Sequence, residues 1–276
     1  MVSKRVSWIG VLLTLIVSHA SMAETTGASV AVPDHPLLAE DLIVTLGLYY
    51  PRSTTSASLA PPGGGTGVMV NFEDTLDLEK RSVVPSLGVF WRASERWRLD
   101  IQYFDVSRDA MRTLGDDVQW GDTVFPAGSA ADSTFDFSDI RVAAAYSFFM
   151  RPDKELGAGV GLHISEIRGA IEASGVGAEA ADITAPLPVL NFYGMFALTN
   201  EWALNMRADW LSLTYGDYRG DVRNLETNFI YQPRRNFGVG LGLRSMLINV
   251  DIDDDDWRGQ ARVSFQGPTA FVTMSF

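Results

Sequence analysis

The chain has 276 residues, a formal net charge of −12 and no cysteine, and 11% of its residues are aromatic. Nucleic-acid binding is excluded, because surplus anions repel a phosphate backbone and no cluster of lysine and arginine with interleaved aromatic residues is present. Without cysteine, the chain has neither a disulfide framework nor a thiolate metal site.

Residues 1–23 have the features of a secretory signal peptide. Lys4 and Arg5 precede an apolar run from Val6 to Val17, and small residues lead up to Ala23. The apolar run is shorter than the ~20 residues that a membrane-spanning helix needs. We therefore expect export, with cleavage after Ala23.

Residues 24–40 contain prolines and no apolar periodicity, which predicts a short, irregular periplasmic arm. From residue 41 onward, apolar and polar residues alternate in stretches typical of β-strands. In chain order these stretches are 42–50, 85–92, 97–103, 135–148, 156–164, 190–196, 202–210, 218–231, 237–244 and 262–276. A tilted strand of about ten residues crosses a bilayer core of ~30 Å, so residues 41–276 are predicted to form an all-β, transmembrane, antiparallel up-and-down β-barrel.

Ten is the preferred strand count. Omitting the weak stretch near Val222 would give eight strands, whereas an added pair from Gly67 to Phe72 and its neighbours would give twelve. A soluble, lipocalin-type barrel is the alternative fold, and its apolar faces would point inward. The faces opposite the apolar ones carry Arg, Asp and runs of Gly, which favours a narrow polar interior and a lipid-facing exterior.

The last stretch, Gly267 to Phe276, is predicted to be the closing strand. Its even-numbered residues from Ala270 to Phe276 are apolar and the residues between them are mostly polar, with Phe271 as the exception. A bulge at Gln266 to Pro268 would change the parity if the strand begins near Arg262.

Long and short connections alternate between the predicted strands. The long ones are 51–81, 109–133, 171–186 and 251–259, and the short ones are 93–96, 149–155, 199–201 and 232–235. Outer-membrane barrels have short periplasmic turns and long external loops, which places both termini in the periplasm. Aromatic residues at the short-turn ends predict an interfacial girdle of Trp91, Trp97, Phe148, Trp202 and Phe276.

Several segments resemble a recurring group of small proteobacterial outer-membrane β-barrel proteins without a settled biochemical role. They are Gly65 to Leu78 with Asn71-Phe72-Glu73-Asp74, Trp91-Arg92 before Ser94-Glu95-Arg96, Gly121-Asp122, and Asp253 to Gly259. The resemblance implies a place in the outer membrane of a Gram-negative bacterium and insertion by the assembly machinery through the last strand, with Phe276 as the assembly signal. We expect a monomer whose partners are outer-membrane lipid and lipopolysaccharide.

Charged residues of both signs fall on the predicted inner faces. They are Arg92, Arg98, Asp100, Asp139, Arg141, Arg207, Asp209 and Arg244. They could line a path for solutes, or they could pair across strands and fill the interior. Pairing is favoured, because an unpaired ion in a low-dielectric interior is costly and barrels of ~8 strands hold only side chains or one small ligand.

The histidines give little support to an enzyme. Barrel enzymes of the outer membrane depend on a histidine beside a nucleophile or a carboxylate. His35 falls in the predicted arm, and His163 shares a face with Ser165 near the middle of a strand, remote from any substrate outside. We therefore predict a protein that is not an enzyme and has no cofactor, with His163 as one polar member of an interior network.

One dense run of acidic residues could bind a divalent cation. It comprises Asp251, Asp253, Asp254, Asp255 and Asp256. A calcium loop needs Gly at its sixth position and Glu at its twelfth, where this run has Asp256 and Arg262. A solvated external loop and weak divalent-cation binding remain as the two interpretations, and no firm metal site is predicted.

Two functions follow from these features. The first is a barrel with a largely occluded lumen that has a structural or surface-interaction role through its external loops. The second is a narrow passive pore for small solutes. The segment from Ser53 to Leu78 can stand outside the barrel or fold inward as a plug. An open pore should show an excess of one charge sign around its constriction, and the mixed signs favour the occluded barrel.

Overall fold

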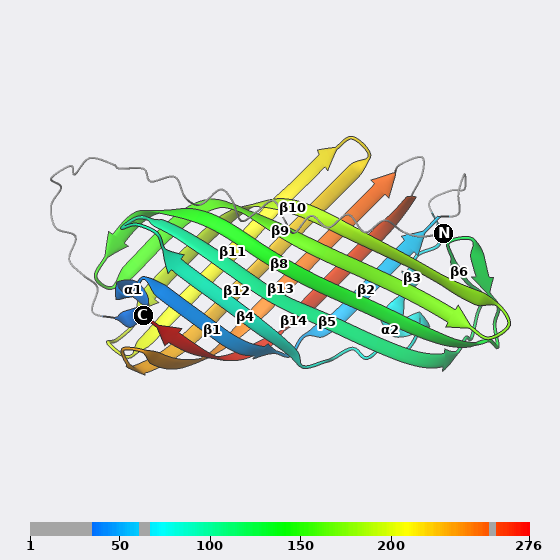
Figure 1. Ribbon diagram of the computed structural model, residues 1–276, viewed down its shortest axis with the longest axis horizontal. Helices are drawn as coiled ribbons and strands as arrows, with labels where there is room; N and C mark the ends of the chain where they lie inside the picture. Colours follow the sequence, from blue (N-terminus) through cyan, green and yellow to red (C-terminus); the bar gives the residue numbers. More distant parts are fainter. Residues whose placement is uncertain (1–34, 61–66, 254–257) are drawn as a thin grey trace. The chain divides into compact units, whose positions relative to one another are not determined.

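A computed structural model describes residues 35–60, 67–253 and 258–276, without the side chains of Tyr215 and Asp253. The predicted signal peptide (1–23), most of the predicted arm (24–34) and Asp254 to Asp256 lie outside the described residues. The strands are β1 (Leu42–Tyr49), β2 (Arg52–Leu59), β3 (Val70–Asn71), β4 (Val84–Arg92), β5 (Trp97–Thr113), β6 (Val118–Trp120), β7 (Thr123–Phe125), β8 (Ala130–Arg151), β9 (Lys154–Ala173), β10 (Gly177–Ala197), β11 (Trp202–Tyr215), β12 (Tyr218–Arg234), β13 (Phe237–Asp253) and β14 (Arg258–Ser275). Two one-turn helices are α1 (Pro36–Ala39) and α2 (Phe72–Thr75) (Figure 1). No helix in these ranges is long and apolar enough to cross a membrane.

The strands form an antiparallel ring in the order β1-β4-β5-β8-β9-β10-β11-β12-β13-β14, and β14 pairs back with β1. The ladder that closes the ring runs from Ile43 opposite Ser275 to Tyr49 opposite Thr269. Phe276 extends it, since its N–H and C=O both bond to the backbone of Leu42 at 2.8 and 3.0 Å. The predicted ten-stranded barrel is confirmed. The alternative of eight is wrong because β12, which contains Val222, is a full strand of the ring. The alternative of twelve is wrong because β2 continues β1 along the same edge of β14 and β3 pairs with β2.

The closing seam is the edge along which β14 pairs with β1 and then with β2. It is interrupted on the side of the first strand, where Tyr50 and Pro51 separate β1 from β2. Strand β14 pairs with β1 up to Thr269 and with β2 from Gln266 onward. Gly267 stands at the changeover, where a Cβ would lie 2.2 Å from the carbonyl oxygen of Tyr50. The predicted bulge at Gln266 to Pro268 is wrong, because β14 pairs with β13 without a register shift along its whole length.

The short turns are confirmed and most of the long loops are not. Ala93 to Arg96 separate β4 from β5 as predicted. At the other end, residues 174–176 alone join β9 to β10, and residues 216–217 alone join β11 to β12. The predicted loop 171–186 is almost entirely strand. The predicted loop 109–133 is shortened at both ends by β5 and β8, which leaves residues 114–129, with the small β6–β7 hairpin, as the connection. Most outward residues of these strand extensions are polar, which removed the apolar alternation on which the sequence prediction depended.

The barrel wall changes its chemistry along each long strand. Near α1 and Phe276, at the end with the short turns and therefore on the periplasmic side, outward side chains such as Leu99 and Ile101 of β5 are apolar. Farther along the same face, Asp105, Ser107 and Asp109 point outward. We call these two parts the membrane half and the outer half, and the outward apolar side chains of the former the apolar belt.

The periplasmic rim of the apolar belt is aromatic. Trp91, Trp97, Phe148, Trp202 and Phe276 are all exposed there, and their positions agree with the predicted girdle. Trp97 packs edge-on against Tyr146 at 5.4 Å between ring centroids.

The polarity of the inward side chains changes in the opposite direction to that of the outward ones. In the outer half most of the inward side chains are apolar and form one buried core. Its largest members include Phe72, Phe104, Trp120, Phe125, Phe135, Phe137 and Phe265. In the membrane half the inward side chains are mostly polar. The apolar-inside arrangement that we associated with a soluble barrel thus describes the outer half, while the membrane half has the polar interior that was predicted.

The end of the predicted irregular arm is a helix inside the periplasmic end of the barrel. Leu37 and Leu38 of α1 are buried against Met195, Ala203 and Ile230. Helix α1 therefore corrects the prediction for residues 35–40, which lack a helical signal because a single turn shows no helical periodicity.

Two contacts at this end explain residues that did not fit the sequence patterns. Phe271, the one apolar residue on the inner face between Gly267 and Phe276, packs against this α1 cluster. His35 is buried, and its Nδ1 accepts a hydrogen bond from the N–H of Leu37 at 3.2 Å, which caps the helix.

Candidate functional site

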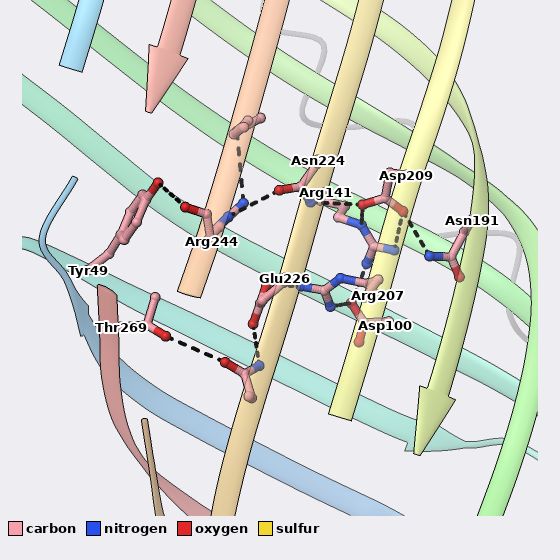
Figure 2. Close-up of polar contacts among 12 residues, drawn as sticks. Tyr49, Asp100, Arg141, Asn191, Arg207, Asp209, Asn224, Glu226, Arg244 and Thr269 are labelled. Carbon is pink, nitrogen blue, oxygen red and sulfur yellow. Dashed lines mark hydrogen bonds and ion pairs between the residues drawn. The ribbon is translucent and has the colours of Figure 1, made fainter. Parts of the chain in front are cut away.

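The centre of the interior in the membrane half is built around Arg141, which β8 places in full burial. Its guanidinium forms a fork on Asp209 of β11, with distances of 2.7 and 2.8 Å from Nε and Nη2 to the two carboxylate oxygens. Its Nη1 also contacts Asp100 of β5 (Figure 2). Bidentate pairing is the strongest geometry that an arginine and a carboxylate can adopt.

Asp209 is saturated with donors. Besides Arg141, the side-chain amides of Asn191 and Asn224 donate to its two oxygens at 2.8 and 2.9 Å (Figure 2). A buried carboxylate is tolerated only when hydrogen bonds replace the water that it has lost. The two asparagines therefore complete a site that one arginine would leave partly unsatisfied.

A second arginine extends the cluster toward the neighbouring strands. Arg207 of β11 reaches Asp100 at 3.2 Å and pairs with Glu226 of β12. Glu226 in turn accepts a hydrogen bond from Asn228 at 2.7 Å. Arg244 of β13 donates to Asn224 at 3.3 Å, so the cluster spans strands from both sides of the interior.

Arg244 also joins the cluster to the apolar core of the outer half. Its guanidinium carbon lies 4.4 Å from the centre of the Phe104 ring. A cation over an aromatic face is stabilised by the ring quadrupole while its apolar surroundings are kept. The polar and apolar layers of the interior therefore meet at this arginine.

His163 of β9 lies between two carboxylates and has no exposed surface. Its Nδ1 is 3.0 Å from Asp139 and its Nε2 is 3.6 Å from Asp209. The hydroxyl of Ser165 donates to Asp139 at 2.7 Å, not to His163. The arrangement lacks the contact between nucleophile and base that covalent catalysis by serine requires.

Arg92 and Arg98 form a separate cluster nearer the periplasm. Both pair with Glu155 of β9, Arg92 at 3.1 Å. The hydroxyl of Tyr193 donates to the same carboxylate at 3.1 Å. Arg92 also donates to the carbonyl oxygen of Leu38 at 3.1 Å, which ties α1 to the barrel wall.

Two groups near α1 lie outside the membrane-spanning segments and have shifted pKa values. Burial lowers the pKa of His35, against a smaller opposing effect of a hydrogen bond with the Glu201 backbone. Arg235, in the turn after β12, pairs with Glu40, and this hydrogen-bonded contact raises the pKa of Arg235.

The structure thus divides the predicted charges between two clusters. Asp100, Asp139, Arg141, Arg207, Asp209 and Arg244 belong to the central one, and Arg92 and Arg98 to the periplasmic one. Sequence reasoning missed Glu155 and Glu226, which are essential partners. Extending the alternation of residues 156–164 by one position would have placed Glu155 inward, and Glu226 shares its face with Asn224 and Asn228.

A third buried ion pair holds an inward-folded segment in the outer half. Glu73 of α2 pairs with Arg108 of β5 at 2.6 Å. The same carboxylate accepts hydrogen bonds from the N–H and the hydroxyl of Thr55 of β2, both at 2.7 Å. Phe72 beside it packs on Trp120 at 5.6 Å between ring centroids, so residues 70–78 fold inward and join the apolar core.

A cavity of about 110 Å³ lies in the membrane half. Polar side chains of the central cluster, including Asp100, Arg207 and Glu226, line one part of it, and Leu37 of α1 and Phe271 line another. Its volume is enough for several water molecules.

The acidic run stays largely untested. Asp251 lies partly exposed near the end of β13, and Asp253 is the last residue of that strand. Within the described ranges, no three or more His, Cys, Asp or Glu side chains are arranged to hold a metal ion. Weak divalent-cation binding by this run remains a prediction.

Comparisons with known proteins show the fold. No protein-family profile and no curated protein matches the sequence. The outer-membrane protease OmpT from Escherichia coli aligns with a TM-score of 0.54 and 10% identity, covering 92% of this chain and 100% of OmpT. Ail, the attachment invasion locus protein of Yersinia pestis, aligns with a TM-score of 0.38 and 7% identity, covering 84% of this chain and 99% of Ail. The toluene transporter TodX of Pseudomonas putida aligns with a TM-score of 0.33 and 10% identity, covering 90% and 93% of the two chains. At these identities, the likeness concerns the fold alone.

Proposed function

We propose that this chain, which has the fold of bacterial outer-membrane β-barrel proteins, is a barrel with an occluded lumen and a structural or surface-interaction role. The observation that carries the proposal is a series of three layers along the interior. The buried apolar core fills the outer half, the central cluster around Arg141 follows, and α1 with the Glu155 cluster stands at the periplasmic end.

The charge balance of the central cluster also supports occlusion. Four carboxylates, from Asp100, Asp139, Asp209 and Glu226, face three guanidinium groups, from Arg141, Arg207 and Arg244. Selective pores use rings of one charge sign, whereas mixed signs pair and hold each other in place.

A surface role fits the outer half. Its outward residues are charged and polar, as on β5, and its strands project beyond the apolar belt. This wall, its turns and the connection formed by residues 114–129 would meet lipopolysaccharide and surface partners. A protein that is not an enzyme agrees with full burial of His163, which no external substrate can reach.

Conductance in planar bilayers tests the proposal. The unmodified protein should give no steady conductance steps. Deleting residues 60–78 leaves two layers in place and should leave the barrel closed, whereas combining that deletion with Arg98→Gln and Arg141→Gln should produce channels. Reproducible channels in the unmodified protein would contradict occlusion. They would make a narrow passive pore the function, with the 110 Å³ cavity as part of its path.

The assembly role of Phe276 is a separate part of the proposal. Its side chain is 58% exposed at the periplasmic rim, where the assembly machinery could recognise it before the ring closes. Phe276→Ser should reduce the amount of inserted protein strongly. Phe148→Ser is the matched control, because Phe148 belongs to the same rim and is also 58% exposed. Equal insertion of the two variants would refute a special role for Phe276.

A further inference from the structure

Strands β10 and β11 separate partway along the barrel. Their ladder ends where Leu190 lies opposite Trp210. Strand β10 nevertheless extends back to Gly177 along β9, and β11 continues to Tyr215 along β12. In Figure 1 the β9–β10 and β11–β12 hairpins run apart toward their turns. The wall of the outer half is therefore open between these two strands.

The opening is an apolar cleft of about 380 Å³, a volume within the range of ligand-binding pockets. Its inner side consists of apolar core residues such as Leu187 and Val222, which are buried. Leu213 and Tyr218 have the strand parity of inward residues, yet they are 47% and 52% exposed because the cleft uncovers them. A soluble surface would not keep such side chains open to water without an occupant.

Two prolines mark the free edge of β10. Pro186 and Pro188 line the cleft and alternate with Leu187. Proline has no N–H to donate and is confined to strand edges whose N–H side has no partner strand. The edge that faces the cleft thus lacks two donors, which prevents β10 from pairing with β11 and suits an apolar occupant.

The cleft begins within the apolar belt, since Leu190 lies opposite Val160 of β9, and it runs from there toward the outer half. Leu190 and Trp210, the last pair of the β10–β11 ladder, point outward and are exposed. Lipid chains that surround the belt therefore reach the mouth of the cleft. Beyond it, Arg219 and Asp251 line an adjoining pocket that offers side chains of both charge signs.

We propose that this cleft binds one hydrocarbon chain of a membrane lipid, which enters sideways from the bilayer while the head group stays outside at the polar rim. The chain would cover Leu213 and Tyr218 and continue the apolar core of the outer half. Such binding goes beyond an occluded barrel, because it gives the protein a site for lipid in its own wall.

The absence of cysteine in the chain permits a direct test with one introduced label. Leu213→Cys and Ser212→Cys, each carrying a bimane fluorophore, are compared in phosphatidylglycerol bilayers whose acyl chains are brominated. The two residues are neighbours on β11 at the same height, but Leu213 lines the cleft and Ser212 faces outward. Bromine quenches by contact, so the label at 213 should lose most of its emission while the label at 212 keeps most of its own.

Equal quenching at both positions would mean that bulk lipid surrounds this height of the wall, and it would overturn the proposal, as would a label at 213 that is not quenched. Thr184→Phe narrows the cleft mouth from the β10 side with a side chain that does not itself quench bimane, and it should restore the emission of the label at 213. The same substitution should not change a label at Leu241→Cys, which lies in the apolar belt away from the cleft. Tyr218→Cys provides a second reporter in the cleft if the label at 213 disturbs folding.

Discussion

Strand β5 carries Leu99 and Ile101 on its outer face in the membrane half and Asp105 and Ser107 on that same face in the outer half. On its inner face the order is reversed, with Arg98 and Asp100 followed by Phe104. The parity of the strand never changes. What changes is the medium outside, from lipid to water.

The comparison shows how each half holds together. In the outer half, water on the outside allows apolar side chains to gather inside and supply the hydrophobic stabilisation of an ordinary soluble domain. In the membrane half, lipid is as apolar as leucine and gives no such inward drive. There the interior depends on ion pairs and hydrogen bonds such as those of Arg141 and Asp209.

The largest effect is expected from breaking the polar interior of the membrane half. Arg141→Met leaves the carboxylates of Asp209 and Asp100 without their main partner, and loss of one member of a buried ion pair costs about 3–5 kcal/mol. Arg168→Met, on the outward face of the outer half, should stay within ~0.5 kcal/mol. Equilibrium unfolding in phospholipid vesicles measures both changes. If the two costs are equal, the central cluster does not hold the membrane half together.

The cost of placing a charge on the outward face of the barrel should differ almost as strongly between the membrane half and the outer half. Val160→Arg places a charge in the apolar belt, which costs about 2–4 kcal/mol near the bilayer midplane. Thr134→Arg, on the outward face of the adjacent β8 in the outer half, meets water and should change the unfolding free energy by less than ~0.5 kcal/mol. Similar costs for the two variants would show that the boundary between the halves is misplaced.

A smaller and local effect is expected at Glu73. Glu73→Gln removes the charge that pairs with Arg108 and should cost about 1–3 kcal/mol, because a buried donor loses its acceptor. Hydrogen exchange should accelerate in β2 and residues 70–78 and stay unchanged in the membrane half. Asp74→Asn is the control, since the ion pair of Asp74 with Lys80 is exposed. Faster exchange throughout the barrel would mean that the two halves open as one unit.

The smallest effect concerns pH at the periplasmic end. Because burial lowers the pKa of His35, the docked state of α1 binds a proton less readily than the undocked state. Docking is therefore fully favoured above the usual histidine pKa of 6.5 and weakens as the pH falls below it. Hydrogen exchange of the α1 amides at pH 7 and pH 5 measures this. His35→Asn retains a capping side chain without a titrating ring and should remove the pH dependence.

The ring of ten strands could be predicted because lipid imposes a strict alternation on the membrane half. Residues 97–103 show it plainly, and Trp97 marks the turn before them. The outer half was missed for the same reason. Asp105 to Asp109 follow the opposite rule, so the strand extension of β5 resembled a loop.

The sequence predicted which charged residues face the interior but not which of them form ion pairs. Strand parity places Arg141 and Asp209 on inner faces. Their pairing, however, depends on which strands face each other across the ring, and the local sequence pattern does not carry this information. Phe271 was an exception to its pattern, and the exception had a cause in α1, which lies more than two hundred residues earlier in the chain.

The break at Tyr50 and Pro51 gives the closing seam two separate ladders, one with β1 and one with β2. Contacts between the two ends of a chain are the slowest to form, because a long loop must close before they gain anything. Here the distant partners keep one register throughout, since Tyr49 lies opposite Thr269 and Arg52 lies opposite Gln266. Between the two ladders the N–H of Tyr50 donates to the carbonyl oxygen of Pro268 at 3.0 Å. Once the first ladder has closed the cylinder, the second therefore starts with its alignment already set, and a single loop closure serves both.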